Sequence, residues 1–152
     1  PPPLLSASGP RFGALPLRIA ASWMAHSLEH LHNTAAIEEV LGKEGEEKGR
    51  IVLLRFGRDH DPECMLTDEL LLQASAHMSN NCRICLVDVD EVAGYCRQYD
   101  LYDPCTIMFF HGGQRLQLEL GLGERHSITW PLTDAKEVLS IFEVGTTACR
   151  SA

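Results

Sequence analysis

Cysteines are the residues of this chain most able to do chemistry, and Cys64 stands in the most informative context. It follows Asp61-Pro62-Glu63, shortly after the apolar run 51–56. A dithiol redox site needs Cys-x-x-Cys where a helix begins, because the helix N-terminus lowers the pKa of the first, exposed thiol. Asp61 occupies the position of that first thiol, so ordinary dithiol exchange is excluded. We expect Asp61 to cap the helix instead.

A pair of cysteines and a cluster of histidines could in principle bind a metal, but we expect no metal site at either. Cys82 and Cys85 have the spacing of half a zinc site, but a separation of three along a strand sends their side chains to opposite faces. No second ligand pair stands at a zinc-type spacing. His26, His30 and His32 have no acidic or cysteine ligand beside them, so we interpret them as surface or capping groups.

An acidic run and a glycine-containing loop complete the candidates. Asp88, Asp90 and Glu91 could suggest a magnesium site, but they lie where a strand becomes a helix, and Asp90 suits the N-cap there. The loop 121–126 has two glycines without the full phosphate-binding pattern. We therefore predict neither a metal nor a cofactor.

Composition indicates one globular domain with a protein partner. The chain has 152 residues, 45% of them hydrophobic, and 21 acidic residues against 13 basic ones give a net charge of -8. This charge repels nucleic-acid phosphates, so any association with RNA should be indirect. No apolar run approaches the ~18 residues of a membrane span, and no membrane partner is expected. Six cysteines are too few and too irregular for a secreted disulfide scaffold, which favours a reducing compartment.

The two ends of the chain differ from its middle. Residues 1–23 are rich in Pro, Ala, Ser and Gly and contain no acidic residue, which predicts a disordered extension. An alternative is a mitochondrial leader, although its prolines interrupt the amphipathic helix that such leaders need. We expect a domain over residues 24–145 and a flexible end over 146–152.

Within the domain, apolar spacing predicts the order αβαβαββα. The expected helices begin at Asn33 or Thr34 (ending at Gly42 or Gly45), at Pro62, at Glu91 and at Pro131, and the expected strands cover 51–56, 84–89, 106–111 and 115–120. Gly112-Gly113 predicts a hairpin between the last two strands. The two strands joined by a helical crossover should be parallel. This is the order of a thioredoxin-like α/β fold: a four-stranded mixed sheet flanked by helices, with an additional N-terminal helix.

Several motifs sharpen this prediction. Arg55-Phe56-Gly57, Asp61-Pro62-x-Cys64-Met65 and Tyr102-Asp103-Pro104-Cys105-Thr106 lie within a stretch from about Met24 to Val144 that resembles the Dim family. This is the family of thioredoxin-like spliceosomal proteins, the fifteen-kilodalton component of the U-five small nuclear ribonucleoprotein. The resemblance implies a nuclear, non-enzymatic subunit that binds other proteins of the U-five snRNP and tri-snRNP during precursor-mRNA splicing. It also implies a link to cell division.

The fold would place Cys105 just before a buried strand and close to Cys64. A disulfide between them is therefore geometrically feasible, while a reducing nucleus favours the free thiols. This pair also supports the alternative function, a monothiol oxidoreductase in which Cys64 forms mixed disulfides and Cys105 resolves them. The isomer of the Asp103-Pro104 bond is left open.

Three aromatic residues near expected loops are candidate interface anchors. Tyr99, Tyr102 and Trp130 have side chains of the kind that often anchor protein interfaces. Core packing is the alternative for each of them.

Overall fold

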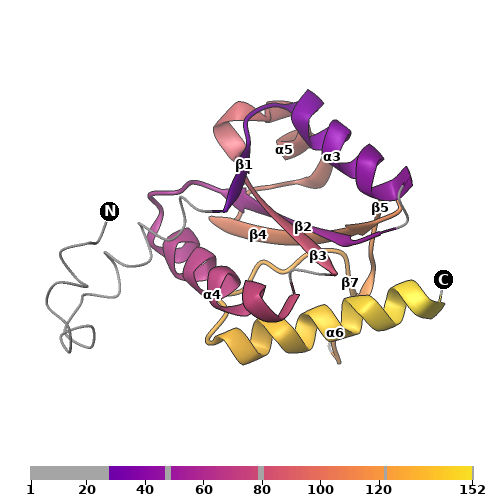
Figure 1. The fold of residues 1–152 in the computed structure, drawn as a ribbon. Coiled ribbons are helices and arrows are strands. Elements are labelled where there is room, and N and C mark those ends of the chain that lie inside the picture. Colours follow the sequence, from indigo (N-terminus) through magenta and orange to yellow (C-terminus); the bar gives the residue numbers. More distant parts are fainter. Residues whose placement is uncertain (1–27, 47–48, 79–80, 122, 152) are drawn as a thin grey trace, which may run out of the picture.

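The computed structural model describes residues 28–46, 49–78, 81–121 and 123–151 (Figure 1). The predicted extension over 1–23 lies outside them. The elements, in chain order, are β1 (Glu29–Leu31), α3 (Thr34–Glu46), β2 (Ile51–Gly57), α4 (Pro62–Met78), β3 (Cys82–Asp88), the 3₁₀ turn η2 (Val89–Glu91), α5 (Ala93–Tyr99), β4 (Cys105–His111), β5 (Gln114–Arg115), β6 (Leu118–Glu119), β7 (Glu124–Arg125) and α6 (Ala135–Ser151). Among these described helices, none has the length and apolar character needed to cross a membrane.

The main sheet has five strands in the order β1-β3-β2-β4-β5. β1, β3 and β2 are parallel, while β4 and β5 continue the sheet in antiparallel pairs. The sheet is thus mixed, as expected, but it contains five strands rather than four. The additional strand is β1, which pairs with β3 through Glu29 and Cys85. Three residues are too few to produce a recognisable alternation of apolar and polar side chains.

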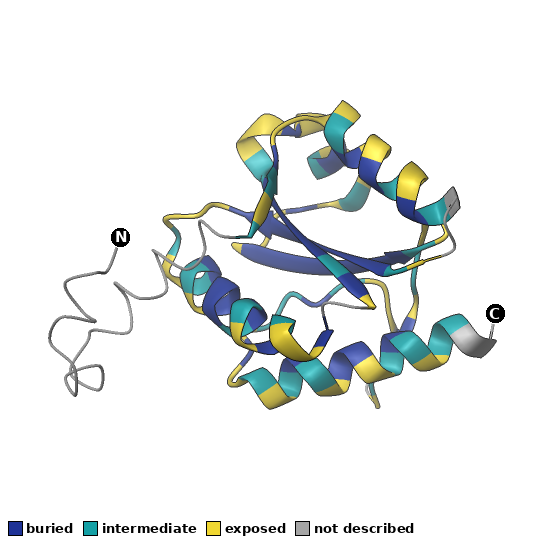
Figure 2. Cartoon of the chain, viewed as in Figure 1, coloured by how far each residue is buried: buried dark blue, intermediate teal, exposed yellow. Residues whose placement is uncertain are grey.

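Helices cover both faces of the sheet and enclose two apolar clusters (Figures 1 and 2). Leu71 of α4 and Ile141 of α6 pack on one face, whereas Ile37 of α3 and Tyr95 of α5 pack on the other. Strands β2 and β4 lie in the centre and contribute residues to both clusters, which is why their sequences are nearly continuous apolar runs. This arrangement is the thioredoxin-like α/β fold that the element order predicts.

The end of α3 and the start of the helical segment before α5 differ from the prediction. Asn33 caps α3 by accepting the N–H of Ala36 at 2.8 Å, but the helix continues past both glycines to Glu46. Gly45 is kept free of a side chain by packing, because a Cβ there would lie 3.2 Å from the backbone of Gly112. The N-cap prediction for Asp90 is wrong: the Asp88 carboxylate accepts the Asp90 N–H at 2.8 Å and caps η2.

The last helix begins and ends later than predicted. Asp134 accepts the N–H of Glu137 at 2.9 Å, and the Glu137 carboxylate accepts the N–H of Thr133 at 2.8 Å. This reciprocal capping starts α6 at Ala135 rather than at Pro131. The helix then continues through Ser151, so residues 146–151, which the sequence places in a flexible end, form its final turns. Cys149 in these turns still packs against the core.

The hairpin is present, but its second strand is divided. Gly112 and Gly113 have φ values of 60° and 81°, and this pair of positive angles suits a two-residue turn between paired strands. The predicted strand 115–120 becomes β5 and, after a break, β6, which pairs with β7 in a separate two-stranded ribbon. Leu118 of β6 is turned into the core and is 1% exposed.

Candidate functional site

The junction between β2 and α4 is built around Asp61. Its carboxylate Oδ1 accepts the N–H groups of Glu63 at 2.9 Å and Cys64 at 3.3 Å, and its carbonyl accepts the N–H of Met65 at 2.9 Å. These are the contacts of a helix N-cap. The position that a redox protein gives to its attacking thiol is therefore occupied by a carboxylate engaged with the helix backbone.

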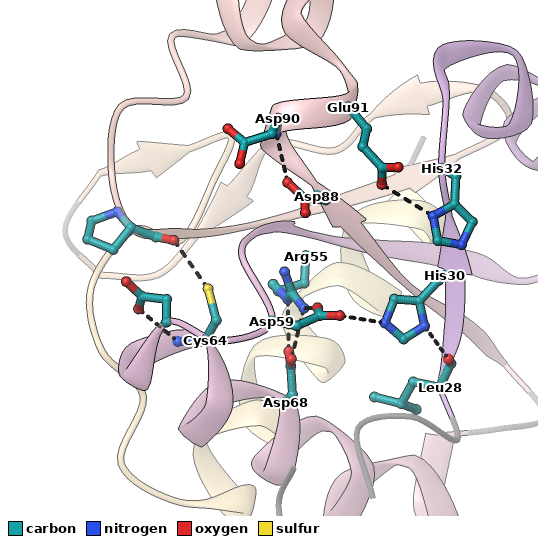
Figure 3. Close-up of polar contacts among 12 residues, drawn as sticks. Leu28, His30, His32, Arg55, Asp59, Cys64, Asp68, Asp88, Asp90 and Glu91 are labelled. Atoms are coloured by element: carbon teal, nitrogen blue, oxygen red, sulfur yellow. Dashed lines mark hydrogen bonds and ion pairs between the residues drawn. The ribbon is translucent and has the colours of Figure 1, made fainter. Parts of the chain in front are cut away.

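Cys64 lies in the first turn of α4 and is completely buried. Its Sγ donates to the carbonyl oxygen of Pro104 at 3.2 Å, which ties the start of α4 to the loop before β4. Gly57 at the end of β2 permits this contact, because a Cβ on that residue would overlap Cys64 Sγ and lie 2.9 Å from the Pro104 oxygen. Helix, strand and loop therefore meet around a single sulfur atom (Figure 3).

Cys105, at the start of β4, is the neighbour of Cys64. A hydrogen bond from the Cys105 thiol, together with the positive charge of Arg55, holds the pKa of Cys64 below its usual value. The same hydrogen bond and burial raise the pKa of Cys105 well above the ordinary range. The fold therefore brings the predicted pair together. Both cysteines are free thiols in the structure, and the disulfide stays a prediction.

A buried ion pair lies beneath this sulfur. Arg55 of β2 binds Asp68 of α4 through two contacts of 2.8 Å, from Nε and Nη2, and both side chains are 0% exposed. Nη2 also donates to Asp59 at 2.6 Å. Burial would lower the pKa of Arg55, but the two carboxylates outweigh it and keep the guanidinium charged. For Asp68, burial is the larger effect and leaves its pKa above the usual value despite Arg55.

One atom of this ion pair has no partner. Nη1 of Arg55 is a buried side-chain nitrogen without a hydrogen bond to any of the described residues. It points toward Gly57, since a Cβ placed there would be 3.3 Å from it. The guanidinium thus contributes positive charge beside Cys64 without donating a hydrogen bond to it.

Histidines extend the polar cluster toward β1. His30 contacts the carbonyl oxygen of Leu28 through Nδ1 at 3.1 Å and Asp59 through Nε2 at 3.0 Å, and His32 contacts Glu91 at 3.2 Å. The two rings stack with centroids 6.1 Å apart (Figure 3). Each histidine thus contacts a different carboxylate, His30 that of Asp59 and His32 that of Glu91. Among the described residues, no group could hold a metal ion, and His26 lies outside them.

Cys82 and Cys85 are placed on opposite sides of the sheet. Cys82 belongs to the cluster beneath α4 and α6, and Cys85 to the cluster beneath α3. Burial raises the pKa of each thiol to about 12, so both are protonated at neutral pH. The two cannot bind one ion, in agreement with the strand geometry.

The three candidate interface aromatics have different surroundings. Tyr99 stacks on Tyr95 with centroids 5.7 Å apart, and the guanidinium of Arg115 lies 4.7 Å above its ring. Trp130 packs against the core and is half-buried. Tyr102, in contrast, is 81% exposed.

A further exposed residue was not singled out by sequence reasoning. Leu66 of α4 is 59% exposed and lies two residues after Cys64, while Tyr102 lies three residues before Cys105. The chain segments that meet at the Cys64 and Pro104 contact therefore each carry one large exposed side chain. Leu66 lies in the helix expected from Pro62, and its exposure is seen only in the structure.

Arg55, Asp59 and Asp68 were also missed as site residues, although the sequence contains a signal for them. Arg55 is a charged residue inside the otherwise apolar run 51–56. A charged side chain in a strand buried on both faces requires an opposite charge nearby. Asp68 and Asp59 supply it.

Fold and site together define a thioredoxin-like protein without the exposed dithiol pair. Among solved structures, thioredoxin of Fasciola hepatica superposes with a TM-score of 0.59 at 16% identity, covering 77% of this chain and 99% of that one. Thioredoxin of Plasmodium falciparum gives a TM-score of 0.58 at 12% identity, covering 76% of this chain and 97% of that one. These likenesses establish the fold.

Sequence comparison identifies the family within this class. The chain belongs to the family described as Mitosis protein DIM1, whose model matches residues 27–152. It is 41% identical to "Mitosis protein dim1" of Schizosaccharomyces pombe over 79% of this chain and 82% of that protein. It is 36% identical to "Spliceosomal protein DIB1" of Saccharomyces cerevisiae over 64% of this chain and 68% of that protein. The family resemblance predicted from the motifs is thereby confirmed.

Proposed function

We propose that this protein is a non-enzymatic, protein-binding subunit of the splicing machinery. Its place would be in the nucleus, among proteins of the U-five snRNP and tri-snRNP, with RNA associated through those proteins. Membership in the DIM1 family and the name of the yeast relative, a spliceosomal protein, support this function. The family name Mitosis protein fits a link to cell division.

The observation that carries the non-enzymatic part is the replacement of the attacking thiol by the Asp61 cap. A dithiol exchange reaction begins when an exposed thiolate attacks a substrate disulfide. At this site the exposed position holds a carboxylate, and the remaining sulfur, Cys64, is 0% exposed and donates to Pro104. A substrate disulfide cannot reach that sulfur without a local opening of the helix start.

Tyr102 and Leu66 support the protein-binding part. These are the two large hydrophobic side chains that are clearly exposed among the described residues, and aromatic residues are frequent anchors of protein interfaces. Of the three aromatics predicted from the sequence, the proposal rests on Tyr102, because Tyr99 and Trp130 contact other parts of the fold.

Immunoprecipitation of the tagged full chain from nuclear extract tests this function. We expect spliceosomal small nuclear RNAs and large splicing proteins to co-purify. A Tyr102→Ala/Leu66→Ala variant should lose part of these proteins, whereas Glu38→Ala/Glu39→Ala, which alters exposed positions on α3, should retain them. Absence of splicing components from the wild-type sample, with the protein folded, would contradict the proposal.

A second candidate, a monothiol oxidoreductase, is favoured by the lowered pKa of Cys64 and by its hydrogen bond with Cys105. In that mechanism the Cys64 thiolate attacks a substrate disulfide, and Cys105 then displaces the reduced substrate as the protein becomes a disulfide. Dithiothreitol or a cellular thiol would supply the two electrons that regenerate the thiols. Insulin reduction decides between the two functions: turnover above background that disappears in Cys64→Ser would establish the enzyme.

A further inference from the structure

A groove of about 430 Å³ lies between α6 and the segment that contains β6, well separated in sequence from the Cys64 site. One wall is the helix α6 and the other is the segment around β6, and these two elements are in contact. The lining residues are Gln117, Glu119, Ser140, Glu143, Val144, Thr147 and Ala148.

The helical wall is a second face of α6. Ser140, Glu143, Val144, Thr147 and Ala148 follow the spacing of 3 and 4 that places side chains on one side of a helix. Ile141 and Phe142 of the same helix are buried in the core, and Val144 packs against that core from the side of the groove. Val144 and Ala148 are half-buried and give the groove an aliphatic floor, whereas Glu143 is exposed at its edge. The face is therefore apolar at its base and acidic at its rim.

Charge is unbalanced in this groove. Glu119 contributes a carboxylate from the strand side and Glu143 contributes one from the helix side, and none of the lining residues that the structure describes is basic. Neither carboxylate takes part in an ion pair or hydrogen bond with the described residues. Some other carboxylates do have a basic partner: Glu44 pairs with Arg50 at 2.7 Å, and Asp90 pairs with Arg58 at 2.7 Å.

We infer that this groove binds a basic, amphipathic segment of a partner protein. The aliphatic stem of an arginine or lysine would lie along Val144 and Ala148, and its charged head would reach Glu119 and Glu143. These two carboxylates repel the phosphates of an RNA backbone, and so does the net charge of -8 of the whole chain. The inference rests on the proposed function only in taking the partner to be a splicing protein, since the chemistry of the groove is independent of that assignment.

A defined probe tests the groove directly. The probe is a twelve-residue acetylated and amidated peptide of three Leu-Ala-Arg-Ala repeats, titrated into the ¹⁵N-labelled full chain and followed by NMR. We expect saturable shift changes at the amides of Ser140, Val144 and Ala148. A twin peptide with Glu in place of Arg and a twelve-residue oligouridylate should produce none there.

Charge-reversed variants identify the site. Glu119→Lys/Glu143→Lys should weaken binding of the arginine peptide by about tenfold or more, because two attractive contacts become repulsive. The matched control is Glu38→Lys/Glu39→Lys, which makes the same change in net charge on the exposed face of α3, and it should weaken binding by less than about threefold. Equal losses in the two variants, shifts confined to another surface, or oligouridylate binding in the groove would each overturn the inference.

Immunoprecipitation separates this inference from the proposed function. If the wild-type chain recovers splicing proteins while the arginine peptide shows no site-specific binding, the groove is wrong and the function stands. If the peptide binds in the groove while no splicing proteins are recovered, the groove stands and the proposed function fails.

Discussion

The buried pair of Arg55 and Asp68 permits a quantitative prediction. Replacing Asp68 with Ala removes two hydrogen bonds of 2.8 Å and leaves a fully buried guanidinium with only the half-exposed Asp59 as a partner. Removing one member of a buried ion pair costs about 3–5 kcal/mol, because the remaining charge stays desolvated. For a domain of this size, with a urea m-value of about 2 kcal/mol/M, the unfolding midpoint should fall by about 1.5–2.5 M.

A second variant shows whether the cost arises from the unpaired charge. Arg55→Met/Asp68→Leu replaces both partners with apolar side chains, and its stability should lie within about 1 kcal/mol of the wild type or above it. Urea unfolding followed by circular dichroism measures both variants. If Asp68→Ala costs less than about 1 kcal/mol, or if the double variant is as unstable as the single one, the assignment of this pair as a structural charge pair is wrong. Failure of Asp68→Ala to fold leaves the double variant as the deciding measurement.

Three further predictions concern local structure. Asp61→Ala should destabilise the fold by about 1 kcal/mol through loss of the N-cap, and Asp61→Asn should have little effect in the same urea assay. Gly57→Ala should destabilise the fold by about 2 kcal/mol or more, because the new methyl group would overlap the Cys64 sulfur. Gly42→Ala, on a helix with open space around it, should stabilise the fold by about 0.5–1 kcal/mol. A neutral effect of Gly57→Ala would refute the close contact. Hydrogen bonding to Arg50 lowers the pKa of Glu44 below its ordinary 4.5, so the contribution of Glu44 to stability is complete above pH 4.5 and is lost as the pH falls. Glu44→Gln should therefore flatten the pH dependence of the unfolding free energy between about pH 5 and 3. An unchanged slope would contradict this.

Local chemistry explains why much of the fold was predictable. The run 51–56 is apolar enough to be a central strand wherever its partners lie, and Gly112-Gly113 specifies a two-residue turn by conformation alone. The Asp61 cap acts on N–H groups two and three residues away, so its geometry follows from the sequence around it. The start at Val89 was missed because Asp88 and Asp90 are both suitable capping residues, and the structure uses Asp88.

The rest of the site depends on contacts between distant parts of the chain. β1 exists because three residues pair with β3 more than fifty positions later, and nothing in those three residues requires it. His30 reaches Asp59, and Arg55 reaches Asp68, only after the sheet and α4 are assembled. The charge within the apolar run could reveal that Arg55 needs a partner, but several carboxylates in the sequence could have supplied it.

The loop before β4 also limits how a partner can be recognised. Pro104 has no N–H, and its carbonyl oxygen already accepts the Cys64 thiol. An extended peptide laid against this loop would therefore find no main-chain donor at Pro104 and an oxygen already engaged. β-strand addition relies on such main-chain pairing, so a peptide that adds to this loop cannot use Pro104 as a pairing residue. The exposed side chain of Tyr102, two residues earlier, is the group that this loop offers to a partner instead.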